Sequence, residues 1–243
     1  MIALKILLYI LLVDLAVILL WFLPCFFYSL TLEKKAYKKV SGWAWFLGSL
    51  TCWGAFFFTR SRVKVIGKEK LPKDSRFVYV ANHVSRFDPM VIIYKLAKHR
   101  VAFISKPSNF KLPFFGKIIC KMGFLKIDRD DPRKALDTIN NAVDLLKADQ
   151  CSIGLYPEGT RSVDGKLGKF HGFMFRIPHQ AEVPIVVAVT RGTEEVAKRF
   201  PFPGGAKIEI KILDVLDVEF VKSHRPVDIS ERVEQLIRAE LGQ

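Results

Sequence analysis

Residues 78–89 read VYVANHVSRFDP, and this stretch decides the fold of the chain. Its first four residues are apolar or aromatic, as in a strand that is buried on both faces. Asp88 and Pro89 are typical of a helix start, with the aspartate near the N-cap and the proline at the first helical position. A buried strand that leads through a short loop into a helix is a building unit of α/β domains.

Similar strand signals occur in both directions along the chain. Short runs rich in β-branched residues predict strands at residues 63–66, 77–81, 101–104, 152–156, 185–190 and 206–213. Helical signals separate several of these strands. We therefore expect an α/β domain with a mixed, largely buried β-sheet flanked by helices.

Two of the predicted helices have clear start signals. Residues 130–148 carry apolar side chains at helical spacing, with an aspartate at position 130 or 131 as the cap and Pro132 in the first turn. The last helix is predicted to start near Asp228, with Glu231 placed for a capping box.

The first 60 residues hold most of the hydrophobic excess of the chain. Residues 6–31 are apolar over a length that could cross a bilayer, although Asp14 and Pro24 interrupt them. This stretch is too long for a secretory signal, and no small-x-small cleavage site closes it. A second apolar stretch, residues 42–58, is rich in tryptophan and phenylalanine. We expect both stretches to be helices that attach the chain to a membrane.

Basic residues flank the second apolar stretch on both sides, at residues 34–39 and 60–64. A full crossing would leave one of these clusters on the outer face, against the tendency of positive charge to stay inside. We therefore predict a hydrophobic helical hairpin at residues 1–60 that dips into one leaflet from the cytoplasmic face, the inner membrane if the source is bacterial. An α/β domain then occupies residues 61–243. The alternative is a transmembrane first helix followed by an amphipathic second one.

The chain is strongly basic, with a formal net charge of +14. This balance implies an anionic partner, which can be nucleic acid, an anionic bilayer or a phosphorylated substrate. Nucleic-acid surfaces interleave basic residues with exposed aromatic ones, whereas the aromatics here gather in the apolar N-terminus, so we expect no nucleic-acid partner. The four cysteines, at positions 25, 52, 120 and 151, lie at no metal-ligand spacing and predict neither a zinc site nor a disulfide framework.

His83 comes directly after a predicted buried strand, where α/β proteins place their sites. Residues five apart on one helix point about 140° apart, so His83 and Asp88 can act together only if the turn between them curls back. A carboxylate bonded to one imidazole nitrogen fixes the tautomer, and the other nitrogen can then take a proton from a hydroxyl. Such a pair is a base that activates a substrate alcohol. The alternative is a loop histidine and a helix cap without a joint role.

Three further segments carry turn-forming or polar residues. Residues 123–129 read GFLKIDR, residues 155–162 read LYPEGTRS, and residues 183–186 read VPIV. In the second of these, a strand runs into a tight Pro-Glu-Gly turn that ends in Arg161. An arginine can hold a phosphate through two parallel hydrogen bonds, so this turn is a candidate phosphate site.

Together with residues 82–88, these segments resemble the four motif blocks of the 1-acyl-glycerol-3-phosphate acyltransferases, the PlsC-like glycerolipid acyltransferases, in the same order. The resemblance implies that His83 is the general base and that Asp88 orients it. It also implies a set of residues that hold the acceptor phosphate or shape its site: Arg161, Glu158, Gly159, Thr160, Arg129 and Lys106. Two positions depart from the family pattern, since Lys126 and Tyr156 stand where phenylalanine is more usual.

The resemblance implies transfer of an acyl chain from acyl-CoA or acyl carrier protein to the 2-hydroxyl of lysophosphatidic acid, at a lipid bilayer. Glycerol 3-phosphate or another lysophospholipid is the alternative acceptor. The resemblance implies neither a metal nor a cofactor, and we expect a monomer. The other histidines, at positions 99, 171, 179 and 224, form no ligand pattern with acidic residues, which argues against a metal-dependent hydrolase.

Overall fold

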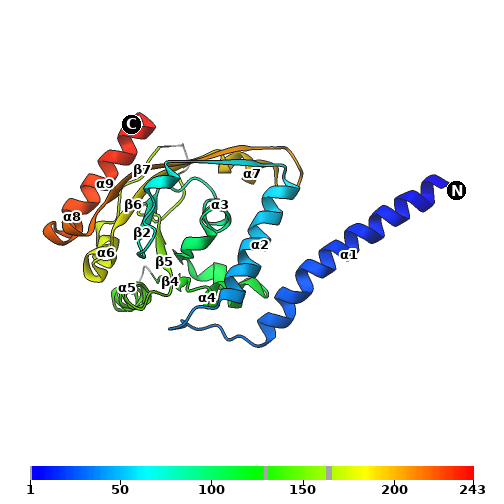
Figure 1. Cartoon of the computed structure of the whole chain (residues 1–243), viewed down its shortest axis with the longest axis horizontal. Coiled ribbons are helices and arrows are strands. Elements are labelled where there is room, and N and C mark those ends of the chain that lie inside the picture. Colours follow the sequence, from blue (N-terminus) through cyan, green and yellow to red (C-terminus); the bar gives the residue numbers. More distant parts are fainter. Residues whose placement is uncertain (1, 129–130, 163–165) are drawn as a thin grey trace.

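The computed structural model describes residues 2–128, 131–162 and 166–243, which form one sheet with helices on both sides (Figure 1). Within this part of the chain, seven strands pair in the order β1-β7-β6-β2-β5-β3-β4. The strands are β1 (Arg62–Ile66), β2 (Val78–Ala81), β3 (Val101–Ser105), β4 (Leu125–Lys126), β5 (Ser152–Leu155), β6 (Ile185–Arg191) and β7 (Lys207–Leu216). The helices are α1 (Ile2–Leu30), α2 (Gly42–Phe58), α3 (Asp88–Lys95), α4 (Phe115–Lys121), α5 (Pro132–Lys147), α6 (Arg176–Ala181), α7 (Thr193–Arg199), α8 (Val218–Ser223) and α9 (Pro226–Leu241).

Strand β2 lies in the middle of the sheet and runs parallel to both of its neighbours. Val80 lies opposite Leu155 of β5 and Val187 of β6. Every residue of β2 and β5 is buried, as in a sheet that is covered on both faces. β7 pairs antiparallel with β6 and parallel with β1, so the sheet is mixed. The predicted mixed, largely buried sheet flanked by helices is confirmed.

Figure 1 shows how the helices cover the sheet, with α2 and α3 on one side and α5, α6 and α9 on the other. The helix predicted for residues 130–148 is α5. Its N-cap is Asp131, whose carboxylate accepts hydrogen bonds from the backbone N–H groups of Arg133 at 3.0 Å and Lys134 at 3.3 Å. Ile139, Val143 and Leu146 are buried and pack on the core, as the helical spacing predicted, whereas Leu136 of the same spacing is 40% exposed.

The last helix starts two residues before the predicted position, and the capping box predicted for Glu231 is wrong. α9 begins at Pro226 after Arg225, and Asp228 is its third residue. The carboxylate of Asp228 accepts a hydrogen bond from the backbone N–H of Arg225 at 3.3 Å and pairs with its guanidinium at 2.9 Å. Asp228 thus takes the place that the sequence pattern gave to Glu231. The pattern missed this because arginine is not among the residues that usually precede a helix as its cap.

The two N-terminal helices meet at residues 31–41 and diverge beyond this connection, so that α1 projects away from the sheet (Figure 1). Tyr28 Oη donates a hydrogen bond to Ser41 Oγ at 2.9 Å and ties the connection together. α2 packs against α3 and α4, and Trp45 and Phe56 are buried in the core. Within the described residues, no helix has both the length and the apolar character that crossing a membrane requires. The division at residue 60 and the membrane attachment stay predictions.

Candidate active site

Predicted site residues from three strands lie at one edge of the sheet. His83 follows β2, Glu158 follows β5, and Lys106 follows β3. Because these three strands run parallel to one another, their carboxyl ends share this edge, where open α/β sheets bind their ligands. β6 is also parallel to β2, and it brings to the same edge Thr193, a residue that the sequence did not single out.

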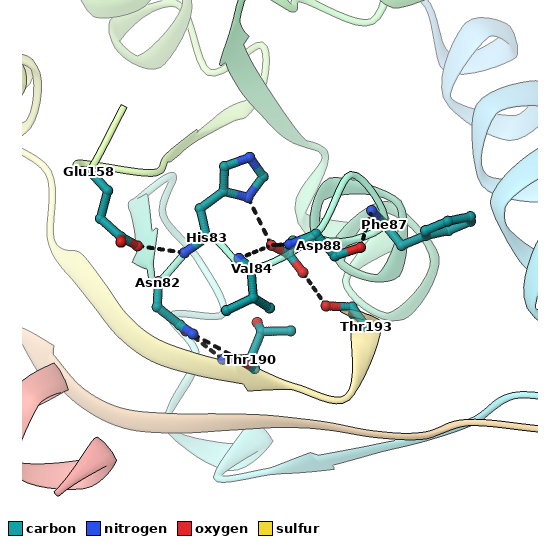
Figure 2. A network of polar contacts seen from close by, with 9 residues as sticks. Asn82, His83, Val84, Phe87, Asp88, Glu158, Thr190 and Thr193 are labelled. Atoms are coloured by element: carbon teal, nitrogen blue, oxygen red, sulfur yellow. Dashed lines mark hydrogen bonds and ion pairs between the residues drawn. The ribbon is translucent and has the colours of Figure 1, made fainter. Parts of the chain in front are cut away.

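His83 and Asp88 meet across the turn between β2 and α3. His83 Nδ1 lies 2.8 Å from Asp88 Oδ2. The same carboxylate oxygen accepts hydrogen bonds from the backbone N–H groups of Val84 and Ser85, both at 2.8 Å, so the turn curls back as a joint role requires (Figure 2). Asp88 is the first residue of α3, and the N-cap is Phe87. Since Nδ1 faces the carboxylate, Nε2 is the ring nitrogen that can take a proton.

Thr193, at the start of α7, provides a further donor to Asp88. Its hydroxyl donates to Asp88 Oδ1, and both side chains are fully buried (Figure 2). The hydrogen bonds to the carboxylate replace the water that it loses on burial. The only local signal for Thr193 is a Gly-Thr pair directly after a buried strand, which is too common a pattern to identify a site residue.

Asn82 connects the end of β2 to β6. Its Nδ2 donates to the backbone carbonyl of Thr190 at 3.0 Å, and its Oδ1 accepts from the backbone N–H of Thr190 at 2.8 Å (Figure 2). Asn82 is buried, and the protein satisfies both ends of its amide. This pair of hydrogen bonds holds β6 beside the turn that carries His83, and so keeps Thr193 next to Asp88.

Glu158 supports His83 from the β5 side. Its Oε1 accepts a hydrogen bond from the backbone N–H of His83 at 2.7 Å, and its Oε2 accepts from the backbone N–H of Gly168 at 2.8 Å. Burial raises the pKa of this carboxyl group, and the two backbone donors act in the opposite direction. The resemblance implies that Glu158 shapes the acceptor site, whereas the structure shows both carboxylate oxygens engaged by the backbone.

Stacked aromatic rings hold the imidazole of His83. The ring of Tyr156 stacks on it with a centroid distance of 4.2 Å and an angle of 13°, and Phe103 stacks on Tyr156 at 5.1 Å and 9°. Gly154 makes room for this stack, since a Cβ there would lie 2.3 Å from the Phe103 ring. Burial and the nearby charge of Asp88 raise the pKa of Tyr156 well above its usual value, so its phenol stays protonated.

The Pro-Glu-Gly turn after β5 brings Thr160 and Arg161 to the surface beside this pair. Gly159 has a φ of 69°, and its N–H closes the turn on a carbonyl three residues earlier at 2.9 Å. The backbone N–H of Ser162 donates to the carbonyl of His83 at 2.8 Å. The side chains of Thr160 and Arg161 are exposed, and the two residues directly precede Ser162 in the chain, so the backbone of the turn lies close to that of His83.

Of the two remaining predicted phosphate ligands, the structure describes Lys106, which comes from the β3 side of the sheet. Lys106 is exposed at the start of the short 3-10 helix η3 (Pro107–Lys111). Arg129 lies outside the described residues, and β4, the strand before it, pairs parallel with β3. Among the described residues, no three histidine, cysteine, aspartate or glutamate side chains gather as they would around a metal ion.

The model of a family described as Acyltransferase matches residues 62–191 of this chain. A chloroplastic 1-acyl-sn-glycerol-3-phosphate acyltransferase of Brassica napus is 33% identical over 167 residues, which are 68% of this chain and 45% of that protein. The 1-acyl-sn-glycerol-3-phosphate acyltransferase of Haemophilus influenzae is 30% identical over 155 residues, which are 62% of this chain and 64% of that protein. The chain thus spans less than half of the plant protein.

Among solved structures, the 1-acyl-sn-glycerophosphate acyltransferase PlsC from Thermotoga maritima has a similar fold. Its TM-score is 0.69 at 26% sequence identity, and the match covers 82% of this chain and 79% of that one. The family match runs from β1 to the end of β6, and it includes His83, Asp88 and the Pro-Glu-Gly turn. Because the match takes in more than half of the chain and the fold is that of a solved acyltransferase, this chain belongs to the acyltransferase family.

Proposed function

We propose that this chain transfers a fatty acyl group from an acyl thioester to the 2-hydroxyl of lysophosphatidic acid, giving phosphatidic acid. The observation that carries the proposal is the contact between His83 and Asp88, at a sheet edge that also holds the Pro-Glu-Gly-Thr-Arg turn. The relatives from Brassica napus and Haemophilus influenzae, which are named 1-acyl-sn-glycerol-3-phosphate acyltransferases, give it independent support.

In this scheme His83 Nε2 removes the proton of the acceptor hydroxyl while the hydroxyl oxygen attacks the carbonyl carbon of the thioester. The tetrahedral intermediate then collapses, the C–S bond breaks, and the imidazolium returns its proton to the departing thiolate. Asp88 stabilises the imidazolium, and its hydrogen bond from Thr193 keeps the carboxylate in place. The acyl group passes directly between substrates, so the scheme uses neither an acyl-enzyme nor a metal or cofactor.

The substrate-binding part of the proposal rests on charge and position. Arg161 is exposed and directly precedes Ser162, whose backbone N–H donates to the carbonyl of His83, and a guanidinium can hold the acceptor phosphate through two parallel hydrogen bonds. Arg129 and Lys106 are proposed as further phosphate ligands, with Gly159 and Thr160 shaping the turn. The net charge of +14 suits the phosphorylated acceptor and either donor, since acyl-CoA and acyl carrier protein are both anionic.

We also propose that α1 and α2 hold the chain on the cytoplasmic face of a membrane. Aromatic side chains of α2 support this, because Trp43, Phe46, Trp53 and Phe57 recur at helical spacing and are 42% to 62% exposed. The opposite face of α2 packs on the core. Extraction of the substrates' acyl chains into water costs about 0.8 kcal/mol per CH₂, and attachment to the membrane avoids this cost.

The test is an acyl-transfer assay of the purified full chain with acyl-CoA and acyl carrier protein as donors. Lysophosphatidic acid, glycerol 3-phosphate and lysophosphatidylcholine serve as competing acceptors. We expect kcat/KM to be highest for lysophosphatidic acid. Faster transfer to either of the other acceptors would overturn the acceptor assignment, and no transfer from either donor would overturn the function.

The Arg161→Ala variant separates phosphate binding from the rest of the site. Its KM for lysophosphatidic acid should rise more than its KM for the donor, and Arg161→Lys should recover only part of the loss, because a lysine cannot form the planar two-bond contact. Arg232→Ala is the control, since Arg232 is exposed on α9. A rise confined to the KM of the donor would show that the assignment of Arg161 to the acceptor phosphate is wrong.

A further inference from the structure

Two phenylalanines are exposed in the loop between α7 and β7, residues 200–203, which read Phe-Pro-Phe-Pro. Phe200 is 46% exposed and Phe202 is 73% exposed. Two large apolar side chains side by side in a loop cost free energy in water, at about 25 cal/mol for each Å² of apolar surface that stays uncovered. An exposed pair of phenylalanine rings is therefore a candidate contact surface.

The base of this loop is fixed to the end of α2. The backbone N–H groups of Gly204 and Gly205 donate to the carbonyl of Thr59, at 3.4 Å and 3.0 Å. The last turn of α2 carries Phe57 and Phe58, which are 62% and 53% exposed. The loop thus extends the exposed aromatic surface of α2 with residues that lie about 140 positions later in the sequence.

Exposed cations surround this aromatic surface. Arg60 and Arg62 follow α2 directly, and Lys207 begins β7 opposite Arg62. All three side chains are exposed. Among the acidic residues of this region, Glu195 pairs with Lys198 at 2.8 Å, which reduces its effect on the electrostatic field at the surface. Aromatic rings beside arginine and lysine are typical of a surface that lies at the level of anionic headgroups.

Helix α7 links the same loop to the catalytic pair, His83 and Asp88. The helix has seven residues, a length of about 10 Å at 1.5 Å per residue. Its first residue, Thr193, donates to Asp88, and the ring of Phe200, directly after its end, lies 5.4 Å from the ring of Phe87. The start of α7 therefore contacts Asp88, the first residue of α3, and the residue after its end contacts Phe87, the N-cap of α3.

We propose that residues 200–203 are a second membrane contact, which adds to that of α1 and α2 and binds the surface of an anionic bilayer. In this arrangement Phe202 enters the interface, the cations lie among the headgroups, and α7 fixes the distance between the lipid surface and the catalytic pair. The inference deepens the proposed function, on which its catalytic consequence rests. The membrane contact is measured without enzyme turnover. Failure of this inference can therefore be distinguished from failure of the proposed function.

A fluorescent reporter at position 202 tests the contact. The native cysteines are buried, so a polarity-sensitive dye should label the Phe202→Cys variant of the full chain selectively. On vesicles of equimolar phosphatidylcholine and phosphatidylglycerol we expect a blue shift of the emission and quenching by lipids brominated in their acyl chains. The control is Gln235→Cys, because Gln235 is exposed on α9, at the end of the molecule far from α2 (Figure 1). If the dye at 202 behaves like the dye at 235 while the protein is bound to vesicles, the proposal is wrong.

The Phe202→Ser variant tests how much the loop contributes to the free energy of vesicle binding and whether it contributes to catalysis. Loss of a phenylalanine from a lipid interface should lower the vesicle partition coefficient about tenfold. Activity on lysophosphatidic acid embedded in vesicles should fall, whereas activity on a short-chain acceptor dissolved in water should stay as in the parent. An equal fall on both acceptors would show a structural defect and overturn the proposal. A parent protein that binds vesicles through residue 202 without any acyl transfer would refute only the proposed function.

Discussion

The imidazole of His83 is held in three ways: its Nδ1 faces Asp88, its ring stacks on Tyr156, and its backbone N–H donates to Glu158. Each contact restricts a different motion of the side chain or of the turn that carries it. A base positioned in this way has its free nitrogen aimed before the substrate arrives, which reduces the ordering that the reaction requires.

The His83→Ala variant should lose about 10²–10⁴-fold in kcat, because the scheme has no other base. The assay uses purified protein, with a thermal melt and vesicle binding as controls for an intact fold. Activity within a few-fold of the parent would exclude the mechanism. Asp88→Asn is a less specific test, because its amide NH₂ group would replace an acceptor oxygen either at the backbone donors of Val84 and Ser85 or at the hydroxyl of Thr193.

Thr193→Val should lower kcat roughly tenfold with little change in KM, since a hydrogen bond to a buried charge contributes about 1.5–3 kcal/mol. Thr193→Ser retains the hydroxyl and should restore kcat. A defect of equal size in both variants would show that Thr193 acts through packing and not through its hydroxyl.

Glu158 should make the stability of the fold depend on pH. Burial raises its pKa in the folded protein above the value of 4.5 that it has when unfolded, so the folded state binds its proton more tightly. Its contribution to the free energy of unfolding is therefore fully present below about pH 4.5 and decreases as the pH rises through the raised value. Urea unfolding of the parent and of Glu158→Gln at several pH values should show this slope in the parent only. The same slope in both proteins would assign it to other groups.

The sequence predicted His83, Asp88 and the Arg161 turn because each lies in a short local pattern. It could not predict Thr193, since the hydrogen bond joins residues 105 positions apart and depends on the pairing of β2 with β6. Nor could it predict that the Glu158 carboxylate faces the backbone of His83, which requires β5 to lie next to β2. Local sequence patterns thus predict candidate site residues one by one, whereas the contacts between them depend on the order of the strands in the sheet.

At the scale of elements, the turn between β6 and α7 controls where Thr193 lies. Gly192 has a φ of 86°, and a Cβ there would lie 2.1 Å from the carbonyl oxygen of Lys207. Only a residue without a side chain can therefore make this turn beside β7.

Gly192→Ala should destabilise the fold by at least about 1–3 kcal/mol, the usual range for a strained backbone, and should lower kcat because Thr193 moves off Asp88. The matched control is Gly242→Ala, where φ is 71° and no atom lies within 4 Å of the added carbon. That change should cost about 1–2 kcal/mol at most and leave kcat unchanged. Thermal unfolding and single-turnover assays compare the two variants. An unchanged kcat in Gly192→Ala would show that the turn does not position Thr193.

Elements with strong local signals were the ones that could be predicted. The strands β2 and β5 are continuous apolar runs, and α5 has both a cap and a regular apolar spacing. The start of α9 was misplaced because the side chain before it, Arg225, carries no usual capping signal. The order of the strands in the sheet could not be predicted, because a sequence pattern indicates which face of a strand is buried but not which strand lies next to it.

At the scale of the whole molecule, α1 and α2 differ in how they join the domain. α2 is part of the core, whereas α1 is attached near its end, where Phe22 and Phe26 contact Phe115 and Phe114 of the α4 region. A truncation that removes α2 would expose Trp45 and Phe56 and unfold the domain.

Deletion of residues 1–20 should therefore keep the melting temperature close to that of the parent and lower the affinity for vesicles. Activity on vesicle-embedded lysophosphatidic acid should fall, and activity on a short-chain acceptor in solution should remain. Flotation with vesicles and the two activity assays measure these outcomes. Undiminished flotation of the truncated chain would show that α1 makes no contribution to membrane attachment.

The pairing of β1 with β7, in which Arg62 lies opposite Lys207, has a consequence for synthesis. At roughly 5–20 residues per second, β1 leaves the ribosome on the order of ten seconds before its partner strand exists. During that interval α1 and α2 have already emerged from the ribosome, whereas Asp88 still lacks the hydrogen bond from the hydroxyl of Thr193. We expect the growing chain to reach the membrane surface first and to become a competent catalyst only there, when its last strand closes the sheet.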